Sequence, residues 1–199
     1  MVKLGIDFDN TLINYDNVFY QLALEKNLIE ENFPQSKLQI RDYLRSKGKN
    51  DEFTELQGEA YGPKILLAKP YEGMTNALMK LKREGIDIVI ISHKTKYPYK
   101  GPKYNLREYA LNWLEEIGFF LEDFLSFNKD DIHFESTKEF KAAKIKELGC
   151  THFIDDLPEI LNLLPDNISK ILFNSELYSQ STKYKVLTHW DNLLDFILK

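Results

Sequence analysis

Two aspartates, Asp7 and Asp9, interrupt an apolar stretch near the start of the chain, LGIDFDNTLI (residues 4–13). A buried carboxylate without a partner is costly, so a compensating charge is expected beside them. Alternate side chains of a strand share a face, so the two carboxylates point the same way. Asn10 and Thr11 follow as polar residues suited to leaving the strand. The aspartate pair is therefore expected at the carboxyl end of a strand, facing a crevice.

A second acidic pair, Asp155 and Asp156, ends another apolar stretch, THFIDD (151–156). Two acidic strand ends in one parallel sheet can converge. Carboxylates that lie together repel unless they share a cation, and hard oxygen ligands suit Mg²⁺. The alternative is that these acids only cap helices, since Asp is a good N-cap. A cap does not need an acid inside an apolar run, which favours the shared site.

The rest of the chain alternates between strand and helix patterns. Apolar runs predict buried strands over 2–8, 86–92, 151–156 and 169–173, with a weaker one over 130–135. Helical patterns lie over 73–85, 105–118, 136–149 and 158–164. This alternation favours a parallel sheet covered on both faces, in which active sites collect at the carboxyl ends of the strands.

Residues 14–69 break this alternation. Helical patterns cover 17–29, 37–48 and 51–62, and no strong strand pattern appears among them. We interpret this stretch as a helical insertion between the first strand and the remaining strand–helix units.

Composition narrows the function classes. With 199 residues, 43% of them hydrophobic, the chain can form one core domain with an inserted subdomain. A formal net charge of −5 argues against general binding to nucleic acid or to a membrane surface. No apolar run is long enough to span a bilayer, and acids near the start argue against a signal peptide, so we expect a cytoplasmic protein. The single cysteine, Cys150, excludes an internal disulfide.

Four stretches resemble, in order, the motifs of the haloacid dehalogenase superfamily. GIDFDNTL resembles the first motif, Asp-x-Asp-x-Thr after an apolar strand. IVIIS resembles the second, STKEFKAAKIKELG the third and FIDDLPE the fourth. The resemblance implies an α/β fold, a Rossmann-like three-layer α/β/α parallel sheet with a small helical cap inserted after the first strand. It implies a catalytic core of residues 1–13 and 70–199, and a cap of residues 14–69.

The resemblance also implies catalytic roles. Asp7 would be the nucleophile that forms an aspartyl-phosphate, and Asp9 the general acid and then the base. Ser92 would donate a hydrogen bond to the phosphoryl oxygens. A lysine at the start of the third-motif helix would neutralise charge, and we choose Lys138, with Lys141 as the alternate.

A magnesium ion would bridge Asp7, the Asp9 backbone carbonyl and Asp156, with Asp155 as a second acidic member of the site. Further residues are assigned to substrate binding by their place beside the motifs: Asn10, Thr11, His93 and Lys94. Residues 92–104 are rich in lysine and tyrosine, and either attract an anionic substrate or form a solvated basic loop.

The expected function is therefore Mg²⁺-dependent hydrolysis of a small phosphorylated metabolite: a sugar, amino-alcohol or nucleotide phosphate, with surface-glycan precursors as one pathway. Asp9 argues against dehalogenation, because dehalogenating members of the family lack this second aspartate. A phosphomutase of the same fold stays open, as does a non-catalytic phosphate-binding regulatory module. We expect neither nucleic acid nor membrane as a partner, and a homodimer is left open.

Overall fold

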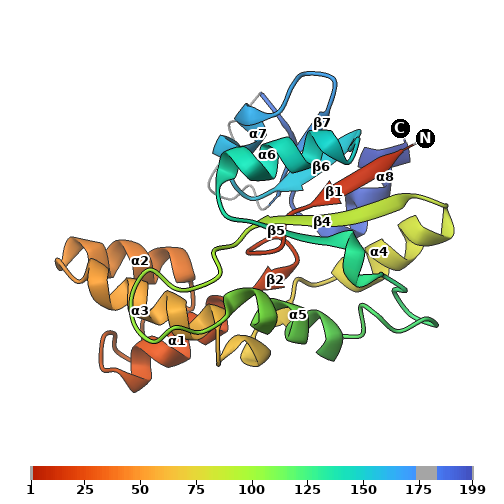
Figure 1. Cartoon of the computed structure of the whole chain (residues 1–199). Coiled ribbons are helices and arrows are strands. Elements are labelled where there is room, and N and C mark those ends of the chain that lie inside the picture. Colours follow the sequence, from red (N-terminus) through yellow and green to blue (C-terminus); the bar gives the residue numbers. More distant parts are fainter. Residues whose placement is uncertain (1, 174–182, 199) are drawn as a thin grey trace. The chain divides into compact units, whose positions relative to one another are not determined.

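The computed structural model describes residues 2–173 and 183–198. The chain forms two compact units, each made of separate segments. The first contains residues 1–13, 70–94 and 118–199, and the second contains residues 14–69 and 95–117. Figure 1 shows the elements of both.

The first unit contains a six-stranded sheet in which every neighbouring pair of strands is parallel. The order is β5 (Ile132–Glu135), β4 (Asp87–His93), β1 (Lys3–Ile6), β6 (His152–Asp155), β7 (Ser169–Phe173) and β8 (Lys185–Leu187). All five predicted strands are confirmed. The sixth, β8, was not predicted, because three residues are too few to establish an alternating pattern.

Helices cover both faces of this sheet, as predicted (Figure 1). One face packs against α6 (Lys138–Glu147) and α7 (Pro158–Leu163), and α4 (Met74–Arg83) and α8 (Leu193–Leu198) lie on the other. Short 3₁₀ helices, η2 (Lys129–Asp131) and η4 (Trp190–Asn192), complete the unit. The buried cluster under α6 and α7 includes Val89, Ile91, Ile145, Phe153, Ile160 and Leu172.

Strand β1 lies in the middle of the sheet, between β4 and β6. Leu4 and Ile6 are fully buried. A Cβ atom added at Gly5 would lie 2.6 Å from the Phe153 ring, so this position has no room for a side chain. Because β1 is parallel to both neighbours, its carboxyl end, which Asp7 follows, lies on the same side of the sheet as the carboxyl ends of β4 and β6.

The second unit is helical, as the pattern over residues 14–69 predicts. It contains α1 (Asp16–Glu25), α2 (Lys37–Ser46), α3 (Asn50–Tyr61), the 3₁₀ helix η1 (Ile65–Leu67) and α5 (Leu106–Glu116). Phe19 of α1 stacks on Phe53 of α3 with ring centroids 5.4 Å apart. Two short strands, β2 (Ile13–Asn14) and β3 (Lys69–Pro70), form a separate two-stranded sheet at the connections to the first unit.

The expected core boundaries need one correction. Residues 95–117 were assigned to the core as part of 70–199, but they pack with residues 14–69. Trp113 is buried and its Nε1 donates a hydrogen bond to the Ala68 carbonyl at 2.9 Å. The amphipathic pattern of α5 predicts a buried face but not its partner, which is why the sequence did not place it.

No helix in the described part of the chain combines the length and apolar character needed to cross a membrane.

Candidate active site

Asp7 lies one residue beyond β1 and is 4% exposed. Its backbone N–H donates to the Ile154 carbonyl at 2.9 Å, which continues the pairing of β1 with β6. The chain then turns sharply, because the backbone N–H groups of Leu12 and Ile13 both donate to the Phe8 carbonyl. The turn keeps the Asp7 carboxylate at the carboxyl end of the central strand, as the sequence predicts.

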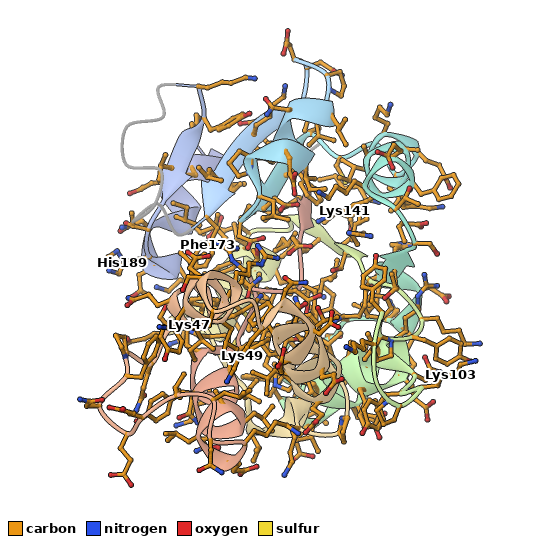
Figure 2. All side chains as sticks on the ribbon, turned by 90° about the vertical axis from the view of Figure 1, so that its left-hand side faces the viewer. Lys47, Lys49, Lys103, Lys141, Phe173 and His189 are labelled. Carbon is orange, nitrogen blue, oxygen red and sulfur yellow. The ribbon has the colours of Figure 1, made fainter. Side chains whose placement is uncertain are left out.

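Lys141 provides the compensating charge that the apolar surroundings of Asp7 demand. Its Nζ donates to Asp7 Oδ1 at 2.5 Å and to Asp155 Oδ2 at 2.6 Å. The lysine is 1% exposed and projects from α6, beside the ribbon of β1 (Figure 2). One ammonium thus joins the carboxylates of two adjacent strands.

The structure corrects the choice of lysine. Lys138 lies in the first turn of α6, and its side chain is partly exposed. Its Nζ pairs with Glu159 at 2.5 Å, and not with Asp7. The alternate, Lys141, occupies the site. A signal for this was present in the sequence: Lys141 lies four residues before Ile145 and seven before Leu148, on the apolar face of the helix.

Burial and charge act against each other in this cluster. Burial alone would lower the pKa of Lys141, but Asp155 and Asp7 more than offset it, and the pKa lies above its ordinary value. Burial raises the pKa of Asp155 to about 7 against the lowering effect of Lys141, and Asp7 acts in the same direction as burial. The single ammonium therefore offsets only part of the burial and the repulsion that oppose ionisation of Asp155.

Thr11 and Ser92 bring hydroxyl groups to the site. Thr11 Oγ1 donates to Asp7 Oδ2 at 3.3 Å. Ser92 lies near the carboxyl end of β4, is 1% exposed, and its Oγ has no hydrogen-bond partner among the described residues. A buried hydroxyl without a partner is uncommon in native proteins, and a water, an ion or a ligand oxygen can supply the missing partner.

Asp9 pairs with a second buried lysine. Lys94 Nζ lies 2.9 Å from both Asp9 Oδ1 and Asp9 Oδ2, and Lys94 is 3% exposed. The sequence placed Lys94 near the site as a substrate-binding residue but did not predict this ion pair. Nothing in the pattern SHK distinguishes a buried lysine from a solvated one.

Three carboxylates could hold a metal ion. Asp7, Asp155 and Asp156 each offer an oxygen within 4.8 Å of the others. Asn10 Nδ2 donates to Asp156 Oδ2 at 3.3 Å, and Asn10 has a left-handed backbone (φ 58°), which asparagine tolerates better than most residues. Asp9 was assigned to the metal through its backbone carbonyl, and that assignment stays a prediction, since this group of three is formed by carboxylate oxygens.

The identified contact of the His93 ring is with a backbone carbonyl and not with a carboxylate of the site. Its Nε2 lies 3.2 Å from the Ser136 carbonyl, on the side of β4 that faces β5. The assignment of His93 to substrate binding stays a prediction. The same holds for Asn10 and Thr11, whose side chains hydrogen-bond to the site carboxylates Asp156 and Asp7.

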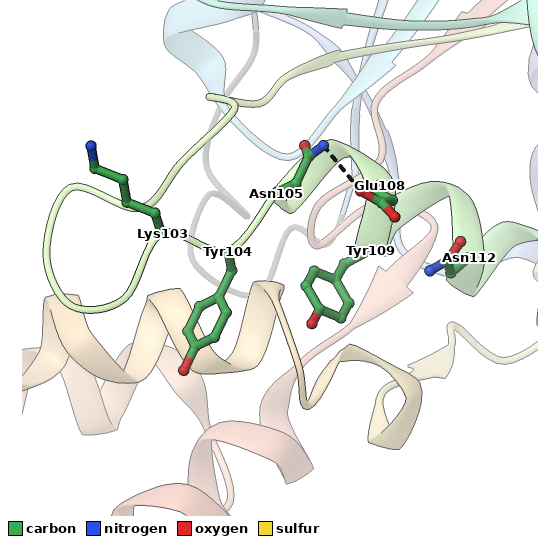
Figure 3. Close-up of a pocket in the computed structure, with 6 residues that line it drawn as sticks. All are labelled: Lys103, Tyr104, Asn105, Glu108, Tyr109 and Asn112. Carbon is green, nitrogen blue, oxygen red and sulfur yellow. Dashed lines mark hydrogen bonds between the residues drawn. The ribbon is translucent and has the colours of Figure 1, made fainter.

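The basic stretch that follows β4 belongs mainly to the second unit. Lys100 there pairs with Asp51 at 2.5 Å, so part of its charge is compensated locally. A cavity of about 290 Å³ lies along α5, lined by Lys103, Tyr104, Asn105, Glu108, Tyr109 and Asn112 (Figure 3). Asn105 Nδ2 donates to Glu108 Oε2 at 3.2 Å within it. This cavity contains none of the four site aspartates.

No protein-family model matches the chain. A Bacillus cereus protein named "Putative nucleotidase" is 24% identical over 204 aligned residues, which cover 100% of this chain and 99% of that protein.

Solved structures match over nearly the whole chain. A "predicted phosphatase" from Clostridium acetobutylicum has a TM-score of 0.63 at 19% identity, covering 99% of this chain and 98% of that one. A haloacid dehalogenase-like hydrolase from Streptococcus pneumoniae has a TM-score of 0.62 at 13% identity, with 98% of each chain covered. The chain therefore has the fold of the haloacid dehalogenase-like hydrolases, which confirms the predicted fold class.

Proposed function

We propose that this chain is a phosphomonoesterase, which transfers the phosphoryl group of a small phosphorylated metabolite first to Asp7 and then to water. One observation carries the proposal: the Asp7 carboxylate is held at the end of the central strand by the buried Lys141 ammonium, 2.5 Å away. A buried ion pair at a strand end of a doubly covered parallel sheet is expensive to maintain for stability alone.

The geometry supports a two-step reaction. Asp7 attacks phosphorus through one carboxylate oxygen, the ester P–O bond breaks, and the leaving oxygen receives a proton from Asp9. Asp9 then accepts a proton from water, which attacks phosphorus and releases inorganic phosphate and Asp7. Lys141 and Thr11 hold the two Asp7 oxygens, and the Ser92 hydroxyl is available to a phosphoryl oxygen.

The donor set fits a divalent cation with a preference for oxygen, and Mg²⁺ is our proposal. Asp7, Asp155 and Asp156 would hold it, because one ammonium leaves these three carboxylates with a net negative charge. When bound, the ion would neutralise charge on the phosphoryl oxygens. Asn10 would orient Asp156 toward it through the hydrogen bond to Oδ2.

Nucleoside monophosphates are the first substrates to test, because the Bacillus cereus relative is named as a nucleotidase. Sugar and amino-alcohol phosphates are retained in the proposal. A role in surface-glycan precursor synthesis belongs to the same group, with no residue that argues for it specifically. A phosphomutase would share the first step and return the phosphoryl group to a sugar in place of water.

We further propose that the second unit selects the leaving group. The chain enters it directly after the turn that carries Asp9, and again directly after Lys94. Replacing both segments of the second unit, residues 14–69 and 95–117, with short linkers should lower kcat/KM for the true substrate but leave some hydrolysis of p-nitrophenyl phosphate. Unchanged selectivity in the shortened protein would refute this role.

The experiment is a phosphate-release assay on p-nitrophenyl phosphate and a panel of nucleotide, sugar and amino-alcohol phosphates, with Mg²⁺ or with EDTA. We expect Mg²⁺-dependent release, with one class strongly preferred and Asp7→Asn inactive. Sugar-phosphate isomerisation without release would establish a mutase. No turnover of any compound, with phosphate binding retained, would support the non-catalytic module.

A further inference from the structure

Lys94 is almost completely buried. Its backbone N–H donates to the Glu135 carbonyl at 2.9 Å, which fixes the main chain against β5. Its Nζ lies 5.3 Å from the centroid of the Phe8 ring, within the range of a cation–π contact. A lysine held at both ends has little of the conformational freedom that a surface lysine keeps.

The charged end of Lys94 meets both oxygens of one carboxylate. Its Nζ lies 2.9 Å from Asp9 Oδ1 and 2.9 Å from Asp9 Oδ2. An ammonium centred between the two oxygens restrains rotation of the carboxylate as well as its distance. The Asp9 side chain is 17% exposed, so solvent screens this pair little.

We propose that Lys94 is a positioning residue for Asp9: it holds the carboxylate in the orientation needed to exchange a proton with the leaving group and with water. This inference rests on the proposed function. It differs from the expectation that Lys94 binds substrate directly, which stays a prediction and which the experiment below tests. Proton transfer depends on a group held within hydrogen-bond reach, so loss of Lys94 should act through Asp9.

The first experiment compares Lys94→Met, Asp9→Asn and the double variant. Burst and steady-state rates are measured with p-nitrophenyl phosphate, whose leaving group needs little protonation. Steady-state rates are also measured with β-glycerophosphate, whose leaving group needs a proton. We expect Lys94→Met to lower kcat on β-glycerophosphate roughly 10- to 100-fold, with KM within about twofold. The double variant should be no slower than Asp9→Asn, because both changes remove the same contribution.

Lys94→Arg should recover part of the lost rate, because it keeps a cation beside Asp9. Lys185→Met is the control: Lys185 is exposed on β8, the strand at the edge of the same sheet, away from the aspartates of the site, and its loss should leave the rates unchanged. A raised KM with kcat intact would show that Lys94 binds substrate, and would overturn the proposal. Equal fractional losses in wild type and Asp9→Asn would overturn it as well.

Urea unfolding provides the second readout, which needs no turnover. Lys94→Met should lower the unfolding midpoint by removing the ammonium 2.9 Å from the Asp9 carboxylate, and the double variant should regain part of the loss. If the protein hydrolyses nothing, the proposed function fails while this coupling is still seen. Additive losses in the unfolding midpoint would contradict the ion pair itself.

Discussion

The candidate site contains two buried lysines, and they differ in what surrounds them. Lys141 comes from a helix and joins Asp7 to Asp155, both of them buried carboxylates on neighbouring strands. Lys94 comes from the end of a strand and holds Asp9, which is partly exposed. Removal of Lys141 leaves two buried acids close together, whereas removal of Lys94 affects a carboxylate that water can already reach. The first lysine therefore supports both fold and chemistry, and the second mainly sets an orientation.

The largest effect is expected at Lys141. Lys141→Met should lower the free energy of unfolding by about 3–5 kcal/mol, because it leaves buried charges unpaired. It should also lower kcat about 10²- to 10³-fold, as loss of a charge-stabilising group does in other active sites. Denaturant unfolding and steady-state kinetics measure the two effects.

Lys138→Met is the matched control for that variant. Lys138 lies on the same helix but pairs with Glu159 at the surface, so its loss should change stability by less than about 1 kcal/mol and the rate little. If Lys138→Met is the crippling change and Lys141→Met is mild, the comparison of the two helix positions is reversed and our site is wrong.

The next effect concerns the metal. Asp156→Asn should raise the Mg²⁺ concentration needed for half-maximal activity roughly 10- to 100-fold, because it weakens a carboxylate ligand. Asp155→Asn should act more on stability, because Asp155 is the partner of Lys141. Mg²⁺ titrations of both variants after EDTA treatment distinguish these outcomes, and full activity of the wild type in EDTA would remove the metal assignment.

Much of this arrangement was predictable from local patterns. The acids at Asp7 and Asp155 interrupt apolar strands, and such an interruption can be read without a structure. Lys141 was harder, because a lysine is assigned to solvent unless the helix face it shares is traced to Ile145 and Leu148. The Lys94–Asp9 pair joins residues 85 positions apart. The hydrogen bond from Trp113 of α5 to the Ala68 carbonyl joins residues 45 positions apart. Such long-range pairings leave no periodic signal.

The smallest effect is expected in the reactivity of Cys150, which reports on the packing of the buried cluster under α6. Cys150 packs in the same cluster as Ile145 and Phe153, and burial raises the pKa of its thiol to about 11. Only the thiolate reacts, so below that pH the folded protein should react slowly with a thiol reagent, and faster as pH rises toward 11.

Reaction of Cys150 at pH 8, followed by absorbance, should therefore be slow in wild type and in Lys94→Met. It should be fast in urea and accelerated in Lys141→Met. Equal rates in folded and unfolded wild type would contradict the burial of this cluster.

The central claim is that Asp7 attacks phosphorus, while Asp9 donates a proton to the leaving group and then accepts one from water. The direct measurement is rapid acid quench of Asp9→Asn with p-nitrophenyl phosphate, followed by mass spectrometry of the peptide that contains Asp7. An activated leaving group needs little protonation, so the first step should survive, and hydrolysis should stall. We expect a phosphoryl group to accumulate on Asp7 in Asp9→Asn and to be absent from Asp7→Asn. Phosphate found on Ser92 or His93, or wild-type turnover by Asp7→Asn, would contradict the account.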